Sequence, residues 1–373
     1  MRPQHLKWVV GMFLVLATAM PALAKDDSQA RHSDDYLQTN LRSDTLTENG
    51  NPPDTNLINP WGIASSPTSP FWIADNGTGV STVYTGAGAT VSPPSPVMIP
   101  PPSVNPGATA APTGIVFNGT SDFKVGGNPA HFIFATEDGT ISAWASGPSA
   151  TLEVDNTDTS ASSPVFKGLA LANSGGTNLL YATNFRNARV DVLGPNFQPF
   201  TSLPGHFVDP GIPNGYAPFG IQLLNGKLYV TYAKQDDLKH DDVAGPGHGF
   251  IDVFNTDGTL AHRLASRGKL NSPWGLAIAP TQFGEFSNDV LVGNFGDGRI
   301  SAYSQDKDLS GDFKGQLKDA HERTIVIGDL WGLRVGNGTA NGGDANKVYF
   351  TAGINAESHG LFGSLESIPE PEH

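Results

Sequence analysis

Cysteine is absent from this chain of 373 residues. Without a thiol, the protein cannot carry out thiol catalysis, hold a zinc–thiolate or iron–sulfur centre, or stabilise itself with disulfide bonds. The fold must therefore depend on a large hydrophobic core, which a single ring of about 340 residues can supply.

Charge is sparse, at 16% of residues, and positive charge is the rarer kind. The chain has 22 Lys and Arg against 36 Asp and Glu, which gives a formal net charge of −14. An acidic field of this kind repels nucleic acid, so we exclude nucleic acid as a partner and expect cations or neutral ligands. The same imbalance also favours solubility without any ligand, and that alternative stays open.

Long hydrophobic runs are missing beyond the N-terminal segment. Arg2 and Lys7 precede an apolar run, Trp8–Met20, and Ala22–Ala24 follows it. This order predicts a signal peptide over residues 1–24, and therefore an exported protein, periplasmic or extracellular. The run has 13 residues, too few to cross a bilayer core of about 30 Å as a helix, so we expect no membrane span.

One short phrase recurs six times along the chain: a small or turn residue, a bulky residue, Gly, then two or three apolar residues. Its glycines are 52, 54, 52, 55 and 57 residues apart, at Gly62, Gly114, Gly168, Gly220, Gly275 and Gly332. Each repeat continues with a β-rich run, a turn and an alternating strand. The sequence therefore predicts an all-β fold, a six-bladed β-propeller with four-stranded blades and one blade per repeat.

The last repeat ends after its third strand, at residues 360–365, and would leave an open sheet edge. Residues 36–41, before the first repeat, belong to no other blade. We expect them to form the outer strand of the last blade and close the ring. The propeller then covers 36–365, with a flexible segment at 25–35 and a flexible tail at 366–373. We expect one domain and a monomer.

The repeats resemble NHL repeats. The resemblance rests on the Pro-x-Gly-Ile-Ala opening and on the strands Arg189–Val192 and Arg299–Ala302. As a whole, the chain resembles a family of exported bacterial NHL-like propellers, some of which have PEP-type C-terminal sorting signals. The resemblance implies the propeller fold and points to a long loop in the fourth repeat, without identifying its chemistry.

The residue before each repeat glycine is expected to lie at one mouth of the central channel. Four of these six residues are aromatic and form a crescent that faces a threonine and a lysine. A concave aromatic wall with one cation suits a sugar, an aromatic compound or a carboxylated ligand. The alternative is that the rings pack between blades. The predicted ligand-binding residues are Trp61, Thr113, Lys167, Phe219, Trp274 and Trp331, with Asn76, Glu137, Asn184 and Asn294 in nearby loops.

The long loop of the fourth repeat is the candidate metal site. Four carboxylates and two imidazoles lie within it, and oxygen ligands favour Ca²⁺, Mg²⁺ or Mn²⁺. A loop of the sixth repeat adds a carboxylate and an imidazole. The alternative is a solvated acidic loop. The predicted metal ligands are Asp236, Asp237, His240, Asp241, Asp242, Glu357 and His359. A positional resemblance to gluconolactonase-like propellers, which hold a metal in the channel, supports testing them.

Three functions therefore stay open. The first is an exported propeller that binds a small molecule or a protein at its channel mouth, with no catalytic residue assigned. The second is a metal-dependent hydrolase or lyase of the lactonase type, with a divalent cation between the loops of blades 4 and 6. The third is a structural scaffold of the envelope or matrix. The binding hypothesis requires solvent-facing tryptophan rings, and the scaffold hypothesis requires a plugged channel.

Overall fold

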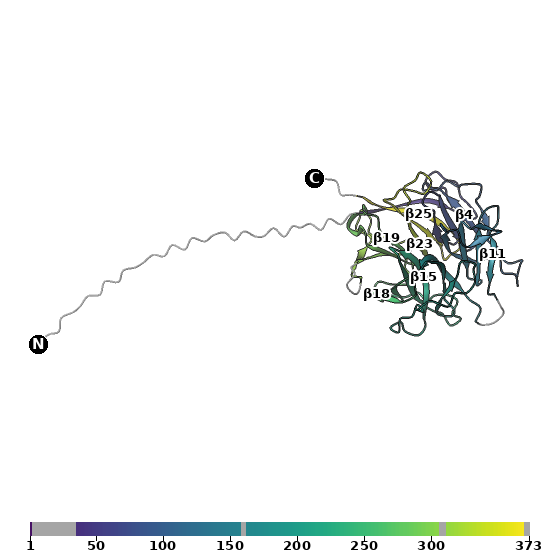
Figure 1. Cartoon of the computed structure of the whole chain (residues 1–373). Helices are drawn as coiled ribbons and strands as arrows, with labels where there is room; N and C mark the ends of the chain where they lie inside the picture. Colours follow the sequence, from purple (N-terminus) through teal and green to yellow (C-terminus); the bar gives the residue numbers. More distant parts are fainter. Residues whose placement is uncertain (2–34, 158–161, 306–310, 369–373) are drawn as a thin grey trace. The chain divides into compact units, whose positions relative to one another are not determined.

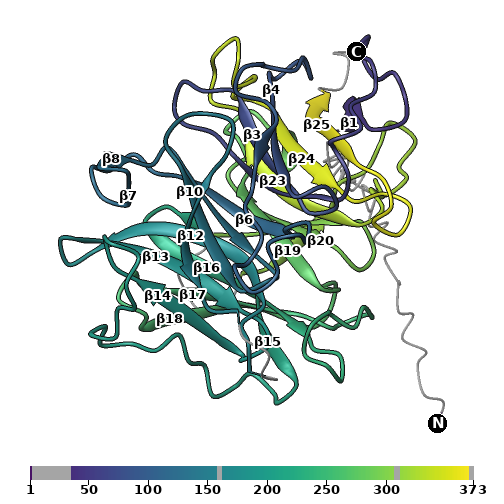
Figure 2. The ribbon, with the colours of Figure 1, turned by 90° about the vertical axis from the view of Figure 1, so that its right-hand side faces the viewer.

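The computed structural model describes Met1 and residues 35–157, 162–305 and 311–368. The predicted signal peptide (apart from Met1), residues 25–34 and the last five residues lie outside the described residues. All described strands belong to one compact unit, Ser33–His373. Within it, six small antiparallel sheets surround a common centre, as Figure 1 and the turned view in Figure 2 show. The predicted six-bladed propeller is confirmed.

Each blade is a meander whose first strand is innermost. Blade 1 contains β2 (Pro60–Ala64), β3 (Phe71–Asp75), β4 (Val80–Tyr84) and β5 (Val97–Met98). Blade 2 contains β6 (Pro112–Phe117), β9 (Phe132–Thr136), β10 (Thr140–Trp144) and β11 (Thr151–Asp155). A two-stranded hairpin, β7 (Lys124–Val125) and β8 (Asn128–Pro129), projects from it. Blade 3 contains β12 (Phe166–Ser174), β13 (Thr177–Asn184) and β14 (Arg189–Leu193).

The remaining blades follow the same order. Blade 4 contains β15 (Tyr216–Leu224), β16 (Lys227–Lys234), β17 (Phe250–Phe254) and β18 (Leu260–Ser266). Blade 5 contains β19 (Pro273–Ile278), the short 3₁₀ helix η1 (Gly284–Phe286), β20 (Val290–Asn294), β21 (Ile300–Tyr303) and β22 (Phe313–Gln316). Blade 6 contains β23 (Leu330–Val335), β24 (Val348–Ala352), β25 (Leu361–Ile368) and β1 (Asp35–Ser43).

Close approach of the inner strands explains the repeated glycine. A Cβ atom on Gly220 would lie 2.2 Å from the carbonyl oxygen of Trp274 in the next blade, and one on Gly275 would lie 2.3 Å from that of Trp331. The other four repeat glycines also face backbone of the next inner strand, at 2.4–3.0 Å. Any side chain here would force two blades apart, so the sixfold phrase is a steric requirement of the ring.

The N-terminal strand closes the ring, as predicted. Strand β1 pairs antiparallel with β25, from Asp35 opposite Ile368 to Ser43 opposite Leu361. The Tyr36 ring stacks on Phe286 of blade 5, and its hydroxyl donates to the carbonyl oxygen of Phe283. This pairing covers the edge that the last blade would otherwise expose. It also extends the propeller past the predicted limits of 36 and 365.

Blade 3 differs from the prediction of four-stranded blades, because only three strands form among the described residues. Beyond β14, a single bridge joins Leu193 to Pro199. Pro199 has no N–H for a ladder, and Pro204 follows shortly after it, so the segment cannot continue as a fourth strand.

The hydrophobic core is divided among the spaces between neighbouring blades. One cluster lies between blades 5 and 6 and includes Leu291, Leu330 and Phe350. Another lies between blades 2 and 3 and includes Ile133, Phe166 and Leu180. None of the described residues forms a helix long and apolar enough to cross a membrane.

Candidate functional site

The channel along the propeller axis is nearly closed. The inner strands enclose a cavity of about 20 Å³, lined by repeat glycines and by apolar residues such as Ile63, Leu169 and Leu276. This is room for about one water molecule. A ligand must therefore bind at one end of the channel and cannot pass through it. We call the end with the residues that precede the glycines the proximal mouth, and the other end the distal mouth.

An aromatic cluster plugs the proximal mouth. Trp61 stacks on Trp331, with ring centroids 3.4 Å apart, and Trp274 meets both rings edge-on. Trp61, Phe219 and Trp331 are buried, with exposures of 3%, 0% and 1%, and Trp274 is partly buried. The binding hypothesis requires solvent-facing rings, and Trp61 and Trp331 do not meet this requirement, because both are buried. These side chains are large and the channel mouth is narrow, so their rings pack against one another. The plugged mouth is what the scaffold hypothesis requires, so any ligand at this mouth must contact polar groups and not the faces of these two rings.

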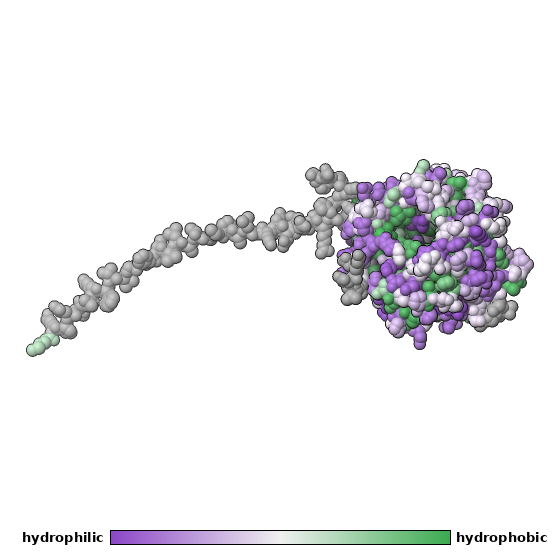
Figure 3. Space-filling view, in the orientation of Figure 1, coloured by the Kyte–Doolittle hydropathy of each residue, from purple (hydrophilic) through white to green (hydrophobic). Residues whose placement is uncertain are grey.

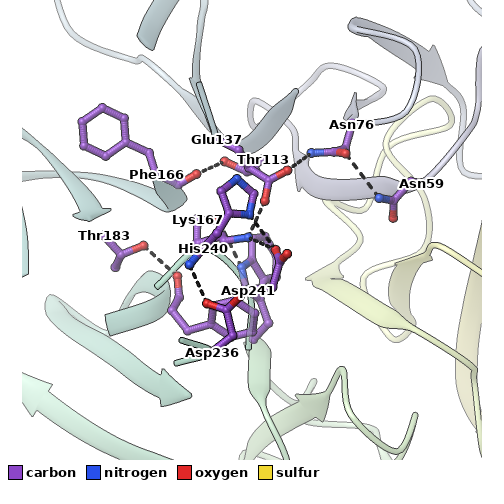
Figure 4. Close-up of polar contacts among 12 residues, drawn as sticks. Asn59, Asn76, Thr113, Glu137, Phe166, Lys167, Thr183, Asp236, His240 and Asp241 are labelled. Carbon is purple, nitrogen blue, oxygen red and sulfur yellow. Dashed lines mark hydrogen bonds and ion pairs between the residues drawn. The ribbon is translucent and has the colours of Figure 1, made fainter. Parts of the chain in front are cut away.

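A buried lysine lies against this cluster, and Figure 4 shows it with its polar neighbours Glu137 and Asp241. Lys167, at the start of β12, is 1% exposed, and its Nζ lies 5.0 Å from the Trp61 ring centroid. The same Nζ donates to Glu137 Oε1 and, at 3.2 Å, to Asp241 Oδ1. Burial opposes a charged ammonium, but the two carboxylates outweigh it and raise the pKa of Lys167. Lys167 is thus a charged group in the neck of the channel.

Three blades supply this charge cluster. Lys167 comes from blade 3, Glu137 from the turn between β9 and β10 of blade 2, and Asp241 from the loop between β16 and β17 of blade 4. Asn76 of blade 1 donates to the other oxygen of Glu137, at 2.9 Å. Asn59 in turn donates to Asn76, at 3.3 Å, and accepts from the Trp331 indole, at 3.1 Å.

The long blade 4 loop is ordered by its own polar groups. A bridge pairs Gln235 with Asp242, and the backbone N–H of His240 donates to Asp236 Oδ1 at 2.8 Å. The Gln235 amide also donates to the carbonyl oxygen of Phe185 in blade 3, at 2.6 Å. These contacts hold the loop over the proximal mouth and present His240 and Asp241 to the cluster.

His240 and Asp241 form a hydrogen-bonded pair that solvent reaches. His240 Nδ1 lies 2.9 Å from Asp241 Oδ1, and the two side chains are 37% and 66% exposed. The hydrogen bond to Asp241 raises the pKa of His240 against the effect of burial. The bond to His240, with help from Lys167, holds the pKa of Asp241 well below its usual range. A carboxylate on Nδ1 leaves Nε2 free to accept a proton or bind a ligand.

Glu357 approaches the same mouth from blade 6. Burial, reinforced by the charges of Glu137, Asp329 and Asp241, raises the pKa of Glu357 to about 7, with Lys167 opposing. It ends three consecutive residues with left-handed backbone, Asn355–Glu357, at φ 61°, 53° and 61°. Such conformations are unfavourable for residues with a Cβ, and they concentrate at functional sites. The charges of Asp241 and Lys167 both influence Glu357, but no hydrogen bond or ion pair among the described residues joins its side chain to the blade 4 loop.

Several predicted residues have other partners. His359 turns to Asp44, with Nδ1 2.7 Å from Oδ2. Asn184 and Asn294 bond within the turns of their own blades, to Asp191 and to the backbone of residues 269 and 271. Thr113 donates to the carbonyl oxygen of Phe166 and fastens blades 2 and 3 together. Each of these four side chains therefore has a partner outside the Lys167 cluster.

The predicted acidic metal ligands of the blade 4 loop differ from one another in their surroundings. Asp236 caps the turn that carries His240, and Asp237 is exposed. Asp242 is partly buried, burial raises its pKa, and its Oδ2 has no hydrogen-bond partner among the described residues. One triad brings its ligand atoms within metal-binding reach, all within 4.8 Å of one another: Glu137, His240 and Asp241. Glu137 of blade 2 was not among the predicted metal ligands, which all lie in the loops of blades 4 and 6.

Two proteins of Acanthamoeba polyphaga mimivirus, both described as uncharacterised, are similar to the chain over most of its length. One is 32% identical over 322 residues, which cover 84% of this chain and 76% of the relative. The other is 33% identical over 323 residues, which cover 84% and 81%. No protein-family model matches the chain, so the NHL assignment, the exported bacterial family and its sorting signal stay predictions.

Solved structures with the same fold are more distant in sequence. An α-L-arabinanase from Penicillium chrysogenum, in complex with arabinobiose, has a TM-score of 0.54 at 11% identity, covering 90% of this chain and 99% of its own. A virginiamycin B lyase from Staphylococcus aureus has a TM-score of 0.50 at 14% identity, covering 90% and 100%. At such identities the likeness shows the propeller fold alone.

Proposed function

The chain belongs to the same family as these two mimivirus proteins, and we propose that it is an exported propeller that binds a small molecule at its proximal mouth. Lys167, Glu137, Asp241, His240 and Glu357 form the binding site. The observation that carries the proposal is the burial of the Lys167 ammonium between carboxylates from two other blades.

A buried ion pair of this kind contributes little to stability. Removing two charges from water costs several kcal/mol per ion, and their attraction often does no more than offset this cost. The other five repeats place a threonine or an aromatic ring at the position of Lys167, so the ring closes without a charge there. A charged cluster that the fold does not need, with perturbed pKa values at a channel mouth, favours a binding role.

The groups that solvent reaches define the ligand. Asp241 and His240 are the most exposed members: the Asp241 carboxylate accepts hydrogen bonds, and Nε2 of the neutral His240 imidazole does so too. The positive charge of Lys167 is already matched by two carboxylates, so the mouth has no excess cation to attract an anion. We therefore propose a ligand that donates hydrogen bonds, either a polyhydroxylated molecule or an amine.

A divalent cation is the second candidate, because Glu137, His240 and Asp241 lie within coordinating distance of one another. Carboxylate oxygens and an imidazole suit Ca²⁺, Mg²⁺ or Mn²⁺. The Lys167 ammonium contacts the same two carboxylates and would compete with the ion. A metal-dependent hydrolase or lyase of the lactonase type would need this ion, with Glu357 as the acid or base.

Thermal unfolding of the purified protein tests both ligands. Polyols, sugars, polyamines, CaCl₂, MgCl₂ and MnCl₂ are added singly, with EDTA as the metal-free reference. A ligand at 100 times its Kd stabilises the folded state by about 2.7 kcal/mol and raises the melting temperature.

Asp241→Asn and His240→Ala should abolish that shift. Asp237→Asn, an exposed residue of the same loop, should leave it unchanged. Stabilisation by a metal salt alone, reversed by EDTA, would replace the first candidate with the second. No shift with any compound would count against both and leave the envelope scaffold.

Export is the part of the proposal that rests on sequence alone. The charged head, apolar run and small residues over 1–24 support cleavage after Ala24. Mass spectrometry of the protein from culture medium and periplasm should find Lys25 at the mature N-terminus. An intact N-terminus in the cytoplasmic fraction would refute export.

A further inference from the structure

The distal mouth of the channel is a pocket in its own right. Its volume is about 440 Å³, and five of the six inner strands line it. The lining residues follow the repeat glycines by one to five positions, towards the opposite end of these strands from Lys167. Its walls are mostly apolar, with Val116, Phe117, Leu171, Leu223 and Val335. Figure 3 shows a largely hydrophilic surface with a hydrophobic area around a hollow near the centre of the visible face.

One cation, Arg334 of β23, lines this pocket. Its Nε donates to Ser65 Oγ at 2.9 Å, and one terminal nitrogen, Nη2, donates to the Ser65 carbonyl oxygen at 2.8 Å. The other terminal nitrogen, Nη1, bonds to no described group, and none of the ion pairs among the described residues includes Arg334. Arg334 is partly buried, and this desolvation, with no carboxylate to offset it, lowers its pKa to about 10.

A second free donor, on the inner strand of blade 4, lines the same pocket. Gln222 of β15 also lines the pocket, and its side-chain amide forms no hydrogen bond within the described parts of the chain. Asn337, in contrast, donates to the carbonyl oxygens of Ser66 and Ser69 and is fully occupied. The distal mouth therefore presents two free donor groups, Arg334 and Gln222, on an apolar background.

The repeats themselves single out these two residues. Two positions after the glycine, four repeats have a small apolar residue: Ala64, Val116, Ala170 and Ala277. Gln222 and Arg334 occupy this position in blades 4 and 6. A fold that needs only a small apolar residue here does not require a guanidinium, whose burial without a counter-charge is costly.

From these observations we propose that the distal mouth binds a small monocarboxylate with an apolar body, whose carboxylate contacts Arg334 and Gln222. An oxyanion supplies the counter-charge that Arg334 lacks, and charge-assisted bonds of this kind are the strong ones. A volume of about 440 Å³ falls in the range of small-molecule pockets. The nearly closed channel separates this site from the proximal mouth.

The single cation favours a carboxylate over a phosphate. One guanidinium with two of its nitrogens engaged by Ser65 can neutralise one negative charge. A phosphate dianion would leave a charge unmatched in a pocket whose walls are mainly hydrocarbon, within a protein of net charge −14. The apolar walls add affinity for a ligand with an alkyl or aryl body.

Isothermal titration calorimetry on the full chain tests the proposal with four probes. Hexanoate and phenylacetate carry the proposed group, 2-phenylethanol is a neutral analogue of the latter, and inorganic phosphate is the competing anion. We expect both carboxylates to bind at least about tenfold more tightly than the alcohol, equivalent to about 1.4 kcal/mol. Arg334→Gln should lose this preference.

Two further variants keep the test decisive if Arg334→Gln fails to fold. Leu223→Glu places a carboxylate in the pocket at a position that is 37% exposed, and should also abolish binding of both acids. Arg299→Gln removes an exposed charge outside the pocket and should change affinity less than about twofold. Equal affinity for the alcohol, tighter binding of phosphate, or no binding of either acid would overturn the proposal.

Discussion

Replacing Lys167 with Met tests whether the proximal cluster is the charged assembly that its geometry indicates. Met fills similar volume but removes the ammonium, and the Glu137 carboxylate, only 13% exposed, keeps a single partner in Asn76. Breaking a buried pair from one side costs 3–5 kcal/mol in typical proteins. The Asp241 side chain is 66% exposed and adds little. We therefore expect the free energy of unfolding to fall by about 3 kcal/mol.

Urea unfolding, followed by tryptophan fluorescence, measures this loss as a lower midpoint at unchanged slope. The double variant Lys167→Met/Glu137→Gln should recover about 1–3 kcal/mol relative to the sum of the single variants, because neither charge is then stranded. Lys314→Met, at an exposed lysine of β22, is the matched control and should stay within about 0.5 kcal/mol of the original.

The pH dependence has a defined sign. The pKa of Lys167 is raised in the folded state, so its contribution to stability is complete below the unfolded value of 10.5 and is lost as the pH rises through the folded value. The penalty of Lys167→Met should therefore be undiminished at pH 8. A penalty below about 1 kcal/mol, or additive single effects, would refute the buried pair.

Three further predictions follow from other parts of the ring. The raised pKa of Glu357, about 7 against 4.5, means that stability is lost as the pH rises between these values, and Glu357→Gln should remove about 1–2 kcal/mol of that loss in urea unfolding at pH 5 and pH 8. Gly275→Ala should cost at least about 3 kcal/mol because its Cβ would meet a carbonyl oxygen at 2.3 Å, whereas Gly107→Ala, with open space, should cost under about 1 kcal/mol. Tyr36→Ala should cost about 3 kcal/mol and increase aggregation by loosening β1 from β25, which light scattering after mild heating would detect. Unchanged stability in any of these variants would contradict the corresponding contact.

The fold was predictable because the repeat obeys a local steric rule. Each repeat glycine faces the backbone of the next blade, so each blade requires one such glycine. The number of blades can therefore be counted from the sequence. Closure by the N-terminal strand followed from an unpaired edge. The three-stranded blade 3 was harder to foresee, since the segment around Pro199 has enough apolar residues for a strand and fails only through a missing N–H.

The proximal site was predictable in its members but not in their arrangement. Lys167 and the blade 4 loop stood out as exceptions to the repeat. The sequence left open whether Trp61 is exposed or packed, because burial at a channel mouth depends on how narrow the ring is. Glu137 of blade 2 and Asp241 of blade 4 meet at Lys167 because the long loop folds inwards, and no local sequence pattern predicts how far it does so.

Arg334 was missed although its signal is present in the repeat. The signal lies two positions after the repeat glycine, where an arginine replaces a small apolar residue. Both exceptional cations, Lys167 and Arg334, flank glycines that the geometry of the ring fixes, and they lie at opposite ends of an almost closed channel. Their surroundings differ in one respect: Lys167 has two carboxylate partners within the protein, and Arg334 has none among the described residues. Because carboxylates of the protein neutralise Lys167, the proximal mouth suits ligands that donate hydrogen bonds to the surrounding acceptors. Arg334 has no such partner among the described residues, so the distal mouth suits a ligand that brings a negative charge.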